Sequence, residues 1–148
     1  MDMRQTHMIL KYTKIISVIT LSFYALLPFI NGLGCNYKSE TVNDNVVYLT
    51  SCKMGIVESI AWNKINGEKK VFKGFLAKKD SSIIFFVTHS LELEKPIYDF
   101  NHGLNLRFSD ATIWSAKLIH TKENDLVLVG NPSYQIYITN ISGKLAFW

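Results

Sequence analysis

The sequence predicts a mainly β protein in which one N-terminal hydrophobic helix precedes an antiparallel barrel or sandwich. Three observations lead to this fold class. Residues 15–34 form an uncharged apolar run that differs from everything after it. The later sequence holds eight or nine short apolar segments, separated by turn residues at roughly ten-residue intervals, as in all-β domains. No long segment after residue 34 has the 3.6-residue apolar period of a helix.

Residues 15–34 have the length and composition of a membrane-spanning helix. A bilayer core of about 30 Å takes roughly 20 apolar residues in a helix, and these residues carry no charge. The preceding residues 1–14 contain Arg4, Lys11 and Lys14 against a single acidic residue. Because basic flanks stay on the cytoplasmic side, we expect 1–14 to be a short cytoplasmic end, 15–34 a transmembrane anchor and the remainder extracytoplasmic.

Two other fates of this segment stay open. A signal peptide cut after Gly34 would place small residues, Gly32 and Gly34, at the positions that a signal peptidase reads. Cys35 would then be the first mature residue, as in a lipoprotein, although Leu33 stands where the lipoprotein pattern has a small residue. The core helix of a soluble protein is a poor match, because such a helix shows one polar face and this run is apolar all round.

The rest of the chain has the size of one ordinary domain and little net charge. The whole-chain charge of +4 owes much to Arg4, Lys11 and Lys14, which leave 13 basic against 11 acidic residues from Cys35 onward. Nucleic-acid binding needs a concentrated basic footprint. We therefore expect no nucleic-acid partner.

The chain has two cysteines, Cys35 and Cys52. An even count in an exported protein indicates a disulfide, and closing a loop of this length stabilises a fold by about 3 kcal/mol in the chain-entropy model. A lipid on Cys35 would exclude the bridge, since its sulfur cannot do both. Two cysteines without a nearby histidine fall short of the four ligands of a structural zinc, so no metal site is expected.

After the anchor, polar residues 35–45 are expected to be a tether, and residues 46–148 the β-rich domain. Asn66-Gly67 tolerates the positive φ of a hairpin turn. Residues 82–90 contain five consecutive apolar residues, which is typical of a strand buried on both faces. A last hairpin is expected around Ser142-Gly143. The segments expected as strands are 46–52, 55–65, 68–77, 82–90, 103–108, 111–120, 126–129, 134–139 and 144–148.

No catalytic motif accompanies these strands. Residues His89, His102 and His120 lie on separate segments, at a spacing that gives no support for a metal site. His89-Ser90 could belong to a triad with Asp99 or Asp110, but no strand-turn-helix frame presents the serine. The sequence therefore predicts no enzyme activity and no cofactor.

Two residue classes suggest binding instead. Phe, Trp and Tyr make up 13% of the chain, and an eight-stranded barrel has room for either a filled core or a small ligand. Phe85, Leu106, Trp114 and Ile136 are the predicted cavity residues. Lysines concentrate between residues 64 and 79, where they suit either a solvated strand surface or contact with anionic lipid headgroups or an acidic partner.

The layout as a whole, a basic end, one span at 15–34 and a small β domain, resembles a bacterial group. Its members are the small single-pass periplasmic partners of membrane-bound winged-helix regulators, of the ToxS-like, PsaF/MyfF-like and VtrC-like kinds. The resemblance implies a calycin-like periplasmic barrel on the bacterial inner membrane. It also implies a non-enzymatic role, in which the barrel pairs with the regulator's outer domain and in some members senses an apolar ligand such as a bile salt.

Two other classes of function compete with this expectation. A cleaved or lipidated leader would make the protein a secreted, outer-membrane or surface accessory protein, so the fate of residues 15–34 separates these classes. A small hydrolase would need convergent histidines or carboxylates, which the sequence does not show.

Overall fold

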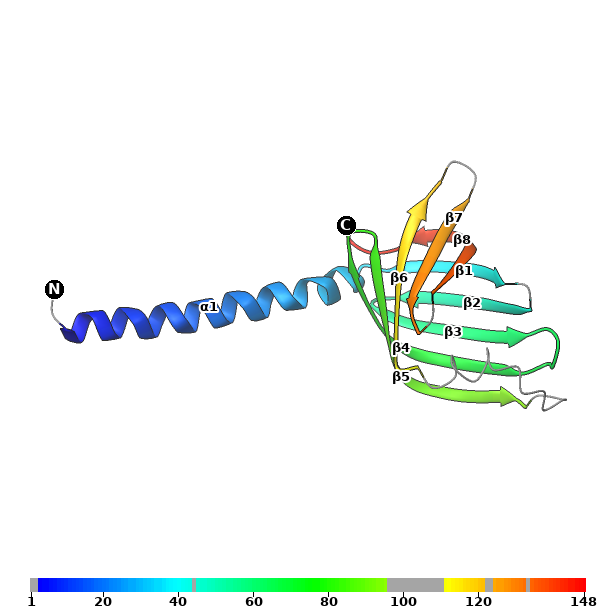
Figure 1. Ribbon diagram of the computed structural model, residues 1–148, viewed down its shortest axis with the longest axis horizontal. Coiled ribbons are helices and arrows are strands. Elements are labelled where there is room, and N and C mark those ends of the chain that lie inside the picture. Colours follow the sequence, from blue (N-terminus) through cyan, green and yellow to red (C-terminus); the bar gives the residue numbers. More distant parts are fainter. Residues whose placement is uncertain (1–2, 44, 96–110, 122–123, 133) are drawn as a thin grey trace.

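A computed structural model describes residues 3–43, 45–95, 111–121, 124–132 and 134–148. The long helix α1 projects from one end of a β-barrel (Figure 1). Within the described residues, eight strands form a closed barrel in sequence order. The elements are α1 (Met3–Gly32), β1 (Asn36–Asn43), β2 (Val46–Lys53), β3 (Ile56–Asn63), β4 (Lys69–Lys79), β5 (Ser82–Glu94), β6 (Ile113–His120), β7 (Asp125–Asn131) and β8 (Gln135–Lys144).

All neighbouring strands pair antiparallel, and β1 closes the barrel by pairing with β8 from Asn36 opposite Lys144 to Val42 opposite Ile138. The prediction of a mainly β fold with an antiparallel barrel is confirmed, and the sandwich alternative is excluded. Closure leaves no edge strand along the β1–β8 seam.

The helix contains a 23-residue segment, Leu10–Gly32, that is long and apolar enough to cross a membrane, and its most apolar 18-residue window has a mean hydropathy of 1.8. Only 11% of its most apolar window is buried, which differs from a core helix of a soluble protein. The structure therefore has one N-terminal apolar helix that fits a membrane anchor or a signal sequence, as predicted.

Residues 35–45 are not a tether, and that prediction is wrong. Most of them form β1, which pairs on both sides with β2 and β8. The reason is a period-two pattern, in which Tyr37, Ser39 and Thr41 face the interior while Lys38 and Glu40 are exposed. The barrel thus begins almost directly after the helix.

The expected hairpin around Ser142-Gly143 is also wrong. Strand β8 runs unbroken to Lys144, because Gly143, with φ at 112°, continues the ladder opposite Tyr37. Residues 145–148 then return to the end of the helix. The predicted strand at 103–108 lies outside the described residues.

The junction of helix and barrel is buried and bridged. Asn31 is 1% exposed and bonds to the backbone of both Lys78 and Trp148. Gly32 lies so close to the Leu76 carbonyl that a methyl group there would overlap it. The Cys35–Cys52 disulfide ties the start of β1 to the end of β2, as predicted. These contacts hold the barrel directly on the helix.

Candidate functional site

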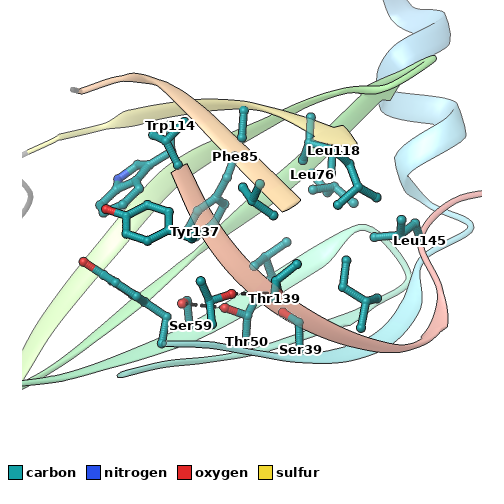
Figure 2. Close-up of a pocket in the computed structure, with 18 of the residues that line it drawn as sticks. Ser39, Thr50, Ser59, Leu76, Phe85, Trp114, Leu118, Tyr137, Thr139 and Leu145 are labelled. Atoms are coloured by element: carbon teal, nitrogen blue, oxygen red, sulfur yellow. Dashed lines mark hydrogen bonds between the residues drawn. The ribbon is translucent and has the colours of Figure 1, made fainter. Parts of the chain in front are cut away.

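The barrel encloses a cavity of about 160 Å³. Alternation along each strand directs every second side chain inward, and the inward side chains differ between the two sides of the barrel. Figure 2 shows Ser39, Thr50, Ser59 and Thr139 on one wall, with Phe85, Leu76 and Leu118 on the opposite wall. The cavity therefore has one hydroxyl-bearing wall and one apolar wall.

The hydroxyl wall comes from β1, β2, β3 and β8. The Oγ1 atoms of Thr41 and Thr139 lie 2.8 Å apart across the β1–β8 seam. Thr50 Oγ1 and Ser59 Oγ lie 2.8 Å apart between β2 and β3. These two hydroxyl pairs give the wall polar groups that hydrogen-bond to each other across neighbouring strands.

The apolar wall comes from β4 to β7, and the end of the cavity far from the helix is aromatic, with Tyr48 from β2 and Tyr137 from β8 beside it. The centroid of the Trp114 ring lies 5.8 Å from that of Phe72 and 6.3 Å from that of Tyr48. The ring centroids of Tyr48 and Tyr137 lie 6.2 Å apart. Trp114 Nε1 donates to the Ala111 carbonyl oxygen, which fixes the indole. Nearer the helix the wall is aliphatic. Its members are Leu76, Ile83, Leu118, Val127 and Val129, with Leu145 at the base.

Three tyrosines line the cavity as neutral phenols. Burial raises the pKa of Tyr37 and of Tyr137 to about 12, and burial together with the nearby Tyr137 raises the pKa of Tyr48 further. All three phenols are neutral at physiological pH, and the Tyr137 hydroxyl donates to Gln135 Oε1. No residue among the described lining residues carries a charge. The cavity can bind by packing and by neutral hydrogen bonds.

Two of the four predicted cavity residues line this site, namely Phe85 and Trp114. Ile136 does not, because it is 68% exposed and its neighbour Tyr137 points inward. Leu106 lies outside the described residues. Sequence reasoning missed the hydroxyl wall, whose signal was the alternation of Ser and Thr with charged residues along β1.

The histidines in the described part of the chain do not come together in one site. His89 is exposed on β5, and His120 pairs at 2.7 Å with Asp125 at the end of β6. His102, Asp99 and Asp110 lie outside the described residues. The described residues contain no group of three or more His, Cys, Asp or Glu side chains that could hold a metal ion.

No protein-family model and no curated protein matches this chain.

Proposed function

We propose that this chain is a non-enzymatic, membrane-anchored binding protein whose barrel lies on the periplasmic side of a bacterial inner membrane. The barrel holds the uncharged part of an apolar or amphipathic molecule, and the protein stabilises or modulates a membrane-bound partner. One observation carries the proposal: a closed barrel, joined rigidly to an apolar helix, encloses a cavity with one apolar and one hydroxyl-bearing wall.

The contacts at the junction support an anchor that remains attached. A cut after Gly34 would remove Asn31, whose side chain bonds to Lys78 and Trp148, and Gly32, which packs on Leu76. The secreted alternative would lose these contacts from the folded barrel. Basic residues before the helix favour a cytoplasmic N-terminus.

The cavity size limits the ligand. A cavity of about 150 Å³ lined by apolar side chains holds a molecule of the size of benzene, whereas sites for drug-sized ligands reach about 300–1,000 Å³. The barrel therefore suits a slim alkyl chain or single ring in its present shape. A wider amphiphile such as a bile salt requires movement of side chains at the aromatic end, around Trp114.

An exposed apolar stripe on the outer face of β8 and β1 supports a protein partner. Ile136, Ile138 and Val42 are 68%, 59% and 46% exposed, and Val42 lies opposite Ile138 in the ladder. Exposed apolar patches on a sheet are typical of interaction sites. Replacing Ile136 and Ile138 by Ser is expected to reduce co-purification of a co-expressed membrane-bound regulator without changing ligand binding.

The ligand proposal is tested with the full chain in lipid nanodiscs. Tryptophan fluorescence and melting temperature are followed during titration with alkyl amphiphiles and bile salts. Ala116 lines the cavity, so Ala116→Leu fills it and is expected to weaken binding at least about tenfold, the cost of roughly 1.4 kcal/mol. Ser51→Leu, on the exposed outer face of β2, is the matched control and leaves binding unchanged. Equal binding by both variants contradicts the proposal.

The anchor is tested separately by the mass of the membrane-extracted protein. An intact chain of 16.9 kDa is expected. A mass that lacks residues 1–34, or one that carries a lipid on Cys35, would establish the alternative class.

A further inference from the structure

The helix and the barrel are joined too closely for the barrel to stand away from a membrane. Helix α1 ends at Gly32 and β1 begins at Asn36, with Cys35 between them held by its disulfide. The segment Leu10–Gly32 is about 35 Å long at 1.5 Å per residue, close to the roughly 30 Å of a bilayer core. If the helix crosses the bilayer, the membrane therefore covers it to its C-terminal end, and the end of the barrel nearest the helix lies at the lipid headgroups.

The hairpin between β4 and β5 extends back along the helix. Lys79 Nζ donates to Tyr24 Oη at 2.7 Å and lies 4.8 Å from the centre of the Tyr24 ring. Tyr24 precedes Gly32 by eight residues, or about 12 Å of helix. This contact ties the hairpin to the helix about 12 Å before the helix ends.

The end of the barrel nearest the helix is apolar and exposed. In the ladder, Ile56 on β3 lies opposite Phe75 on β4, and both are more than half exposed. We name the exposed apolar residues at this end the basal surface. Its residues are Leu33, Met54, Ile56, Phe75, Phe147 and Trp148, with exposures between 52% and 71%.

An apolar crevice opens beside the basal surface, in the angle between helix and barrel. Its volume is about 300 Å³, and its walls include Leu26 and Phe29 from the helix and Phe75 from β4. The Phe29 ring also stacks on Phe86. Water would hydrate these walls poorly, whereas an acyl chain would fill the space.

Lysines surround this end without acidic partners. Among the described residues, Lys53, Lys79 and Lys144 form no ion pair. Lys144 lies 5.6 Å from the centre of the Phe147 ring. At the far end, Lys69 pairs with Glu94 at 2.8 Å and Lys70 pairs with Glu68 at 3.1 Å, whereas Lys64 and Lys95 form no ion pair among the described residues. Lys53, Lys79 and Lys144 thus leave positive charge beside the basal surface that no described acidic group neutralises.

We propose that the basal surface is a lipid-binding site that seats the barrel in the interfacial zone of an anionic bilayer. Its aromatic and aliphatic side chains enter the headgroup region, Lys53 and Lys144 contact anionic headgroups, and an acyl chain occupies the crevice. This inference rests on the proposed membrane anchor. It assigns to the barrel itself a lipid contact that the anchor alone does not require.

The test measures quenching of single tryptophans by lipids brominated near the headgroup, with the full chain in phosphatidylglycerol-containing nanodiscs. Three variants each keep one tryptophan and replace the others by Phe. The first keeps Trp148 on the basal surface, and the second keeps Trp62, which is 41% exposed on β3 toward the far end. The third places Trp at Phe23, near the middle of the helix, and reports insertion through lipids brominated near the end of the acyl chain.

We expect quenching of Trp148 and of the Phe23→Trp probe, and no quenching of Trp62. Quenching of the helix probe without Trp148 overturns the inference and leaves the anchor intact. Quenching of neither means that the helix is not inserted, so the proposed anchor fails as well. Quenching of both Trp62 and Trp148 overturns the assignment to one end of the barrel.

A charge test completes the experiment. Lys53→Gln with Lys144→Gln is expected to reduce Trp148 quenching in phosphatidylglycerol nanodiscs. Lys64→Gln with Lys95→Gln, which removes the same charge from the far end, is the matched control and leaves Trp148 quenching unchanged. If the two double variants behave alike, anionic headgroups are not the ligand.

Discussion

Asn31 and Trp148, which are 117 residues apart, bind each other through two hydrogen bonds. Asn31 Nδ2 donates to the Trp148 backbone oxygen at 3.0 Å, and the Trp148 N–H donates to Asn31 Oδ1 at 2.9 Å. Asn31 Nδ2 also donates to the Lys78 carbonyl oxygen at 3.0 Å. One buried amide thus joins the helix end, the β4–β5 hairpin and the segment after β8.

Replacing this amide is expected to loosen all three elements. Asn31→Ala should lower the free energy of unfolding by about 2–4 kcal/mol, because it leaves buried backbone groups unpaired and opens a small cavity. Asn140→Ala, at an exposed position of β8, should cost less than about 0.5 kcal/mol. Urea unfolding of both variants measures the difference, and equal costs would contradict the role of Asn31.

Gly32 is expected to tolerate no side chain. A Cβ at Gly32 would overlap the Leu76 carbonyl, whereas at Gly130 its nearest neighbour would be Ser115 Oγ at 3.7 Å. Gly32→Ala should therefore destabilise the protein by about 1–3 kcal/mol. Gly130→Ala should be close to neutral. The melting temperatures of the two variants are compared. A larger drop is expected for Gly32→Ala, because a Cβ has no room at Gly32 and has room at Gly130.

The disulfide is expected to contribute strongly to a small barrel. The double variant Cys35→Ser/Cys52→Ser should unfold about 2–5 kcal/mol more easily than the parent. A reductant should lower the stability of the parent to a similar level and leave the variant unchanged. If the parent does not respond to reductant, or if alkylation finds free thiols in it, the bridge does not form.

The hydroxyl pair across the β1–β8 seam is expected to act as a unit. Thr139 is 4% exposed, so Thr139→Val leaves the Thr41 hydroxyl without its partner and should cost about 1 kcal/mol. The double variant Thr41→Val/Thr139→Val should cost less than the sum of the single variants. Additive costs in this double-mutant cycle would show that the two hydroxyls are not coupled.

Buried tyrosines predict a loss of stability at alkaline pH. Burial raises the pKa of Tyr37 from 10.0 to about 12, so the native state keeps a proton that the unfolded chain loses. The stabilisation is fully present below pH 10 and declines as the pH rises through the folded-state pKa, by about 1 kcal/mol near pH 11. Unfolding curves between pH 8 and 11 should show this decline. Tyr37→Phe should make it shallower, and Tyr134→Phe, at an 87% exposed position, should not.

The fold class could be predicted because the two signals behind it are local. An uncharged run in residues 15–34 has few explanations besides a membrane or export helix, and turn residues at regular intervals delimit strands. The strand β1 escaped prediction because its inward residues are polar. Ser39 and Thr41 alternate with Lys38 and Glu40, so a search for apolar alternation finds nothing there.

The same cause explains Ile136. Apolar residues normally face the interior of a barrel, which predicts Ile136 and Ile138 inward. In β8, Tyr137, Thr139 and Ile141 face inward, so Ile136 and Ile138 face out. Which of two alternating faces lines a cavity depends on the strands opposite it, and a single strand does not contain that information. The aromatic and aliphatic wall, by contrast, follows the usual rule, and Phe85 and Trp114 were predicted there.

The wall between the cavity and the helix is one residue thick at Leu76. Its side chain lines the cavity, while its carbonyl oxygen lies against Gly32 and its N–H donates to the Gly55 carbonyl oxygen at 2.9 Å. Leu76 therefore touches the cavity with its side chain and the helix end with its backbone. Because Asn31 and Gly32 are buried against this strand, a change in how Leu76 packs inside the barrel would act directly on the end of the helix.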